Sequence, residues 1–233
     1  NMTNSKTRLQ SVMNFIKLAE QQAHRHPGSV KLLAVSKTWP ASRLRELAEA
    51  GQTRFGENYL QEALEKIAAL DDLTLEWHFI GPVQSNKTRE IAVHFDWVQS
   101  VDRLKIAQRL SAQRPQHKTP LNICLQVNID NEPSKSGVQP EKLLELAAAV
   151  SQLDNLCLRG LMVIPAIAET EEKQLDTFGR AQQLFSELKI AHPEADTLSM
   201  GMSADMQAAI TQGSTMVRIG TALFGERHTP DKQ

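Results

Sequence analysis

The sequence holds few cysteines, few aromatic residues and no excess of charge of either sign. Its 233 residues include two cysteines, and aromatic side chains make up 5% of the chain. Cys124 and Cys157 lie in separate apolar segments, which argues against a disulfide framework or a cysteine metal site and indicates reduced, buried thiols. The formal net charge of −1 gives no electrostatic reason to expect nucleic acid or an anionic membrane as the main partner. Binding is therefore expected at a local site.

Long apolar runs are also missing, and so is the basic stretch with an apolar core that marks a secretion signal. We therefore expect neither secretion nor membrane insertion, and we expect a cytoplasmic protein. The seven histidines are scattered along the chain, so no metal site is predicted. Asn1 precedes a methionine, and we expect Met2 to be the natural first residue.

The chain does contain a regular alternation of short apolar segments with helical patterns. A helix is expected up to about Gln22, because apolar residues recur at helical spacing, at Leu9, Val12, Phe15, Ile16 and Ala19. Strand-like segments follow at residues 32–36, 54–56, 77–80, 97–101, 122–128, 158–163, 197–200 and 216–219. Helix-like segments separate them, at 42–50, 59–70, 86–93, 103–112, 140–153, 172–191 and 204–212, and a short terminal helix is expected after Thr221.

Strict alternation of strands and helices predicts parallel strands with right-handed crossovers. Eight such units in a chain of this length predict a single-domain (β/α)8 TIM barrel over residues 2–230, preceded by the N-terminal helix. An open doubly wound sheet is the main alternative. It is disfavoured because no Gly-x-Gly-x-x-Gly turn follows the first strand.

In a barrel of this kind, functional side chains follow the carboxyl ends of the strands. Lys37 closes the first strand, where partial desolvation can turn its amine into a nucleophile that traps carbonyl groups. The alternative is a lysine that only leaves the strand for solvent. Asn58, after the second strand, either positions part of a ligand or caps the next helix. His78 is at least as probable in a hydrogen-bonded core role as in a catalytic one.

The last two strand ends carry the features of an anion site. Gly201 permits close approach of a backbone, and Ser203 is placed as the N-cap of the next helix. Gly220 and Thr221 offer N–H groups and a hydroxyl after the eighth strand. Alone, each motif is equally a capped helix or a tight turn. Phosphate sites of barrels frequently occupy these two loops, however, and barrel closure brings both near Lys37.

A lysine that forms an imine beside a phosphate cradle describes a site for pyridoxal 5'-phosphate. Arg218 is then the expected partner of the pyridine nitrogen. Because a guanidinium stays protonated, it can donate to this nitrogen but weakens the electron sink of the ring. Such a site is poorly suited to transamination.

Five ordered segments of the chain closely resemble the pyridoxal phosphate homeostasis protein family, and the resemblance runs nearly end to end. They are LAVSKT (33–38), FGENY (55–59), WHFIGPVQSNK (77–87), SMGMS (199–203) and MVRIGT (216–221). The chain resembles a bacterial member, and the family has the fold of the alanine racemase amino-terminal barrel. The resemblance implies that Lys37 holds pyridoxal 5'-phosphate as a Schiff base. It also assigns the phosphate to Ser203, Gly220 and Thr221, the ring nitrogen to Arg218, and neighbouring positions to Asn58 and Met202.

The resemblance implies binding, buffering or supply of the cofactor, with no established catalysis and no catalytic residue. Apoenzymes that use the cofactor are the candidate recipients, and we expect a monomer. The enzyme alternative is a racemase or lyase. Racemases of the related fold use a tyrosine base from a further domain, whereas we expect no second domain here, and the single tyrosine, Tyr59, has no evident route across the site. A barrel aldolase that uses Lys37 without any cofactor is a second alternative.

Two further residues stand near the predicted site. Lys135, in the loop after the fifth strand, either contacts a ligand or serves solvation, and solvation is favoured for a polar loop that ends in glycine. Trp39 departs from the smaller or charged residues expected after the Ser-Lys-Thr motif. It is expected to alter the rim of the site and not the imine.

Overall fold

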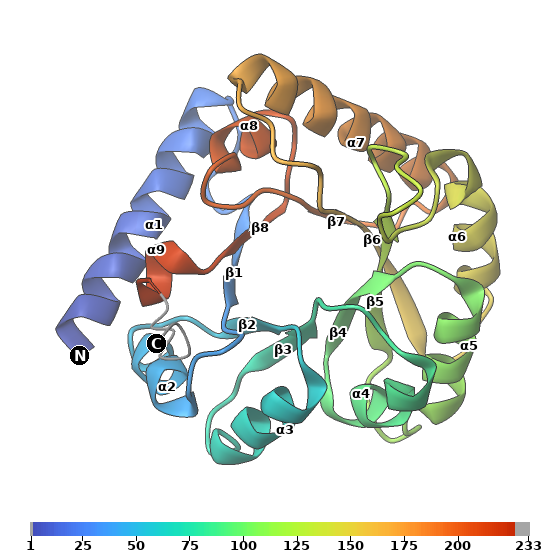
Figure 1. Ribbon diagram of the computed structural model, residues 1–233, viewed down its shortest axis with the longest axis horizontal. Helices are drawn as coiled ribbons and strands as arrows, with labels where there is room; N and C mark the ends of the chain where they lie inside the picture. Colours follow the sequence, from blue (N-terminus) through green and yellow to red (C-terminus); the bar gives the residue numbers. More distant parts are fainter. Residues whose placement is uncertain (1, 227–233) are drawn as a thin grey trace.

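Eight parallel strands close into a barrel, and their order around the ring follows their order along the chain (Figure 1). This computed structural model describes residues 2–226, with side chains from Asn4 onward. The strands are β1 (Lys31–Val35), β2 (Arg54–Glu57), β3 (Glu76–Phe79), β4 (Trp97–Val101), β5 (Leu121–Val127), β6 (Leu156–Val163), β7 (Thr197–Ser199) and β8 (Met216–Ile219). All eight predicted strands and the predicted barrel are confirmed.

Helices surround the barrel in an outer layer. They are α1 (Met2–Gln22), α2 (Ala41–Glu49), α3 (Leu60–Ala69), α4 (Thr88–His94), α5 (Leu104–Gln113), α6 (Leu143–Ser151), α7 (Glu171–Ala191), α8 (Met206–Thr211) and α9 (Thr221–Phe224). Two 3-10 turns, η1 (Ser85–Lys87) and η2 (Pro140–Lys142), lead into α4 and α6. The N-terminal helix α1 packs against α2, α8 and α9, and so covers the region where the first and last units meet (Figure 1).

The alternation of side chains along each strand divides the buried residues into two sets. One set faces the helices and forms the main apolar core, which includes Phe55, Trp77 and Val217. The other set faces the interior of the barrel. There, Leu33, Val35, Ile80 and Met216 form one small cluster, and Trp97, Cys124 and Met162 form another. The interior is therefore packed with side chains and is not a pore. The predicted burial is confirmed for Cys124 and is wrong for Cys157, which is exposed.

His78 belongs to this interior and has a structural role. The side chain is fully buried, its Nε2 lies 2.7 Å from Oε1 of Glu76, and its Nδ1 lies 2.8 Å from Nε2 of Gln99. The ring also stacks on Trp97, with centroids 4.8 Å apart. Burial lowers the pKa of His78 and so favours the neutral ring, although Glu76 acts in the opposite direction. The interpretation of His78 as a core histidine is confirmed.

At two helix starts that follow the carboxyl ends of strands, the capping residue differs from the one expected. The helix after the seventh strand begins at Met206 and not at Ala204, so Ser203 is not its N-cap. The helix after the second strand begins at Leu60, its N-cap is Tyr59, and no side chain caps it, so Asn58 does not serve as a cap. Of the predicted domain, residues 227–230 lie outside the described residues. None of the helices in the described part has the length and apolarity needed to cross a bilayer.

The main core predicts a large effect of Phe55. Its side chain is fully buried and lies 5.8 Å from the Trp77 ring, centroid to centroid. Phe55→Ala leaves a cavity, so the free energy of unfolding in urea should fall by about 3–5 kcal/mol. Tyr59→Ala is the matched control, because Tyr59 is 54% exposed and the change should stay within about 0.5 kcal/mol. Equal losses for the two variants would contradict this assignment of the core.

Candidate functional site

A cavity of about 390 Å³ opens at the carboxyl ends of the first strand and the last three strands. The predicted site residues that line it come from three separate parts of the chain, and they are Lys37, Met202, Ser203, Arg218, Gly220 and Thr221. The loop after β6 supplies the remaining wall through Pro165, Ile167 and Ala168. Its size lies within the range typical of small-molecule sites.

Lys37 reaches this cavity from a turn that follows β1. The strand ends at Val35, and the half-buried Lys37 lies two residues further on. The turn is fixed by backbone hydrogen bonds at Ser36, whose N–H donates to Gly56 O (3.0 Å) and whose carbonyl accepts from Trp39 N–H (3.1 Å). Thr38, the next residue after Lys37, has a φ of 69°. The lysine is thus presented by a tight, left-handed turn and not by the strand itself.

The loop between β7 and α8 presents backbone N–H groups to the cavity. Gly201 has a φ of 106°, and its carbonyl accepts from Arg218 N–H at 2.9 Å, which ties the loop to β8. The carboxylate of Asp205 accepts from Met202 N–H at 2.7 Å. Within residues 2–226, no protein acceptor lies against the N–H of Ser203 or of Ala204. Both exposed N–H groups are therefore available to an anion.

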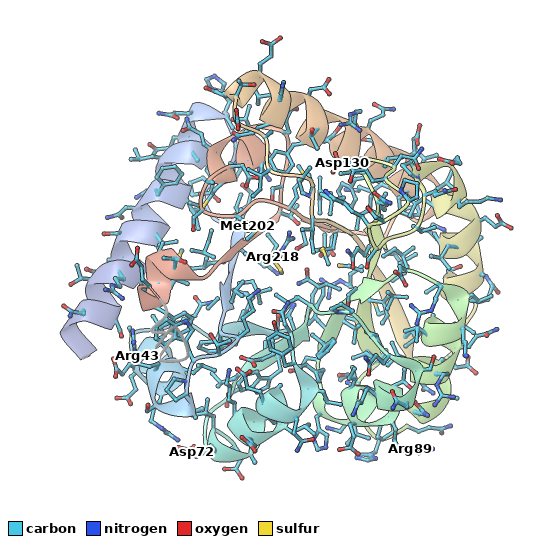
Figure 2. All side chains as sticks on the ribbon, viewed as in Figure 1. Arg43, Asp72, Arg89, Asp130, Met202 and Arg218 are labelled. Atoms are coloured by element: carbon cyan, nitrogen blue, oxygen red, sulfur yellow. The ribbon has the colours of Figure 1, made fainter. Side chains whose placement is uncertain are left out.

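Arg218 forms the inner wall of the cavity and projects into the ring of strands (Figure 2). It is buried, and its guanidinium donates to Ser199 Oγ (2.8 Å) and to Val163 O (2.9 Å). Burial lowers the pKa of Arg218 to about 10, so the group stays charged at neutral pH. A guanidinium has five N–H donors. These two contacts use two of them, and further donors remain for a ligand.

Asn58 is the one predicted site residue that does not line this cavity. It follows β2, and its backbone packs so closely on Gly81 that a Cβ there would lie 2.9 Å from Cα of Asn58. The side-chain Oδ1 is buried without a hydrogen-bond partner among the described residues. A buried acceptor without a partner costs free energy, so this oxygen can accept a further hydrogen bond.

Sequence reasoning missed part of the cavity wall. Asp205 and Gln174 also line it; Asp205 lies at the end of the predicted anion-binding segment but was given no role, and Gln174 belongs to no motif that pointed to the site. Asp205 lies four residues from Gly201 and its signal was present, since an acid at a helix start is a usual loop-closing group. Gln174 is in α7, and no local pattern connects it with β8. Its position follows only from the way α7 packs.

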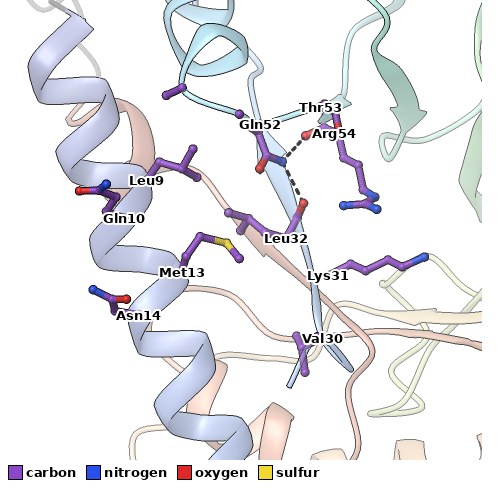
Figure 3. Close-up of a pocket in the computed structure, with 13 residues that line it drawn as sticks. Leu9, Gln10, Met13, Asn14, Val30, Lys31, Leu32, Gln52, Thr53 and Arg54 are labelled. Atoms are coloured by element: carbon purple, nitrogen blue, oxygen red, sulfur yellow. Dashed lines mark hydrogen bonds between the residues drawn. The ribbon is translucent and has the colours of Figure 1, made fainter. Parts of the chain in front are cut away.

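A second cavity, of about 490 Å³, lies at the opposite end of the barrel between α1 and the amino ends of β1 and β2 (Figure 3). Gln52 crosses between the strands there, and its Nε2 donates to Leu32 O (2.9 Å) and Arg54 O (2.7 Å). None of the predicted site residues lines this cavity. In barrels this end serves stability, whereas the chemistry resides at the other end.

A family model of the alanine racemase N-terminal domain matches residues 10–228 of the chain. Among similar curated proteins is the pyridoxal phosphate homeostasis protein of Pseudomonas aeruginosa, with 61% identity over 91% of this chain and 91% of that one. The proteins of the same name from Pasteurella multocida and Escherichia coli are 55% and 53% identical, each over 94% of this chain. The matches cover 96% of the Pasteurella protein and 95% of the Escherichia protein.

Similar solved structures include PipY of Synechococcus elongatus, in one structure without and in another with bound PLP. The structure with PLP has a TM-score of 0.83 and 39% identity, and the match covers 95% of this chain and all 100% of that one. An alanine racemase of Clostridium difficile has a TM-score of 0.76 at 17% identity and covers 98% of this chain and 58% of that one. At this identity, the racemase comparison shows only a shared barrel fold.

The β7–α8 loop predicts a specific effect of Gly201. Gly201→Ala adds a strained positive φ and a Cβ 2.7 Å from Cβ of Ala209, so it should lower the unfolding free energy by about 2 kcal/mol or more. Gly28→Ala is the matched control. It has a φ of 85° but meets nothing within 4 Å, so only the conformational cost of about 1 kcal/mol remains. Equal losses in urea unfolding would show that the contact with Ala209 is relieved.

Proposed function

We propose that this chain, which belongs to the pyridoxal phosphate homeostasis protein family, binds pyridoxal 5'-phosphate in the cavity at the carboxyl ends of β1, β7 and β8. Its role is to hold the cofactor and so to contribute to the balance of pyridoxal 5'-phosphate in the cell. The observation that carries the proposal is the convergence of Lys37, the β7–α8 loop and the start of α9 on one cavity. The relatives that bear the family name and the PLP-bound PipY structure support it.

The residues of the cavity fit the chemical groups of the cofactor. An aldehyde needs an amine, and Lys37 supplies one. A phosphate needs N–H donors and hydroxyls, which the loop at Ser203 and the turn at Gly220 and Thr221 offer. A pyridine nitrogen needs a donor, and Arg218 keeps N–H groups beyond those bound to Ser199 and Val163. Asn58, which was predicted to lie beside the cofactor, does not line this cavity, so we assign it no contact with the cofactor.

Each residue then has one role in retention. The Lys37 amine would hold the aldehyde through a reversible covalent link, formed with loss of one water. Ser203, Gly220 and Thr221 anchor the phosphate, and Met202 covers one side of the cavity. Arg218 keeps its own proton at neutral pH, and so leaves the ring nitrogen unprotonated. When bound, the cofactor supplies an electron sink, which is weakest in this unprotonated form.

We further propose that the protein carries the cofactor and does not catalyse a reaction with it. Racemisation needs a second base on the far side of the substrate. The ionisable groups that line the cavity are Lys37, Asp205 and Arg218, and the Asp205 carboxylate already accepts from Met202 N–H. Tyr59 is 54% exposed and does not line the cavity. Recipient apoenzymes and a monomeric state are part of this proposal.

Covalent capture tests the site. Borohydride reduction of the purified protein loaded with pyridoxal 5'-phosphate should fix the cofactor on Lys37, as peptide mass mapping will show. Lys37→Ala should abolish the visible absorption of the imine and cost little stability, because a half-buried turn lysine packs little surface. Lys118→Ala, an exposed lysine near the other end of the barrel, should behave as the unmodified protein. An adduct chiefly on Lys135 or Lys87 would overturn the site, and a protein that gains no imine absorption would exclude the cofactor.

Isotope exchange tests the absence of catalysis. The loaded protein is incubated with L-amino acids in deuterated water, and the α-hydrogen is followed by proton NMR. Without a second base in the cavity, we expect the α-hydrogen to remain. A free-cofactor sample at equal concentration is the control for the non-enzymatic rate. Exchange at a useful turnover, lost in Lys37→Ala, would favour the racemase alternative.

A further inference from the structure

A cluster of three charged side chains lies behind the turn that carries Lys37. Glu57 closes β2, and Glu62 and Lys66 lie on α3. Glu57 is fully buried and Lys66 is 4% exposed. The Lys66 ammonium lies 3.0 Å from both carboxylate oxygens of Glu57 and 2.6 Å from Oε1 of Glu62. Two acids thus share one buried lysine in the layer between the barrel wall and α3.

Burying such charges is costly, and a buried ion pair is often no more stabilising than apolar side chains of the same volume. Burial is also the largest influence on Glu57 and raises its pKa against the opposing charge of Lys66. Stability alone is therefore a weak explanation for a buried pair of this kind. What distinguishes the cluster is the set of groups that it contacts.

All three side chains contact the turn on either side of Lys37. The hydroxyl of Ser36 donates to the Glu57 carboxylate, and Lys66 Nζ donates to Ser36 O at 2.8 Å. The backbone N–H of Thr38 donates to Oε1 of Glu62. The residue before Lys37 is therefore held by Glu57 and Lys66, and the residue after it is held by Glu62. These are charge-assisted hydrogen bonds, which are stronger than neutral ones.

These contacts hold Thr38 in a strained backbone conformation. Its φ of 69° lies in the left-handed region, which a β-branched residue adopts only under constraint. Strain of this kind persists where surrounding contacts over-determine the backbone. The hydrogen bond from Thr38 N–H to Glu62 is such a contact. Without it, the turn can relax toward a different course and carry Lys37 with it.

We infer that Glu57, Glu62 and Lys66 position Lys37, because they hold the strained turn that presents its amine to the cavity. The inference rests on the proposed role of Lys37 and adds to it a group of positioning residues that do not line the cavity themselves. Glu62 is the member best suited to a test, since its side chain is 30% exposed and its removal leaves the Glu57–Lys66 pair intact.

The test compares Glu62→Ala with Glu62→Gln and Glu65→Ala. Glu62→Ala removes the acceptor for Thr38 N–H, so we expect about a tenfold faster release of pyridoxal 5'-phosphate into an excess of an acceptor apoenzyme. Glu62→Gln should restore the rate, because the amide oxygen still accepts from Thr38. Glu65→Ala removes an exposed acid from the same helix, α3, and should leave the release rate unchanged.

A second readout needs no cofactor. In the apoprotein, the acylation rate of Lys37 relative to the other lysines, measured by mass mapping, should change severalfold in Glu62→Ala and not in Glu65→Ala. Adding Thr38→Gly to Glu62→Ala should move both readouts back, since glycine adopts the left-handed conformation without strain. Rescue of this kind is not expected if Glu62 only stabilises the fold.

The outcomes distinguish a failure of the positioning inference from a failure of the proposed function. If Glu62→Ala keeps the release rate and the Lys37 acylation rate of the unmodified protein, the positioning inference is wrong while the site stands. If the unmodified protein forms no adduct at Lys37, the proposed function fails, and the acylation series still decides whether the cluster positions the turn. If Glu62→Ala does not fold, two other variants are compared. They are Glu62→Gln alone and Glu62→Gln combined with Thr38→Gly. A Lys37 acylation rate that differs between these two variants would contradict the inference.

Discussion

Pairing of β8 with β1 is the interaction on which the rest of this structure depends. The two strands align Lys31 with Met216 and Ala34 with Ile219, and this register closes the ring. Closure brings the turn after β1 beside the turn after β8, although the two are separated by nearly the whole chain. A lysine and an anion cradle that share no local sequence therefore line one cavity. Helix α1, packed on α2, α8 and α9, covers the same junction from outside.

The wall of the barrel separates two groups of charged side chains. Inside it, Arg218 is buried, bound to Ser199 and Val163, and available to a ligand from the cavity side. Outside it, Glu57 and Lys66 form a buried pair that never reaches the cavity. The turn at Lys37 lies between the two, with its side chain toward the first and its backbone held by the second. In the proposed function, both matter, because the Lys37 amine must be present and must be correctly placed.

An alanine racemase shares this barrel fold at 17% identity, and a shared fold does not decide the activity. The difference lies in which groups face the ligand. Here the cavity holds an amine, N–H donors, a charged guanidinium and one committed carboxylate, a set suited to holding a phosphorylated aldehyde. Ile167 and Met202, which both line this cavity, have exposed apolar side chains.

The sequence by itself determined the barrel, because strand–helix alternation is a local signal and parallel strands place their carboxyl ends on one face. Motifs at those ends also singled out Lys37, Ser203, Arg218, Gly220 and Thr221, which the fold brings to one cavity. It did not determine the start of α8 or the role of Asn58, since capping patterns allow several boundaries. Only the tertiary structure decided that Glu57, Glu62 and Lys66 hold the turn at Lys37, and that Gln174 joins the wall. Such contacts depend on how α3 and α7 pack against the barrel, and no pattern along the chain encodes the distance between a helix and a turn on a neighbouring strand.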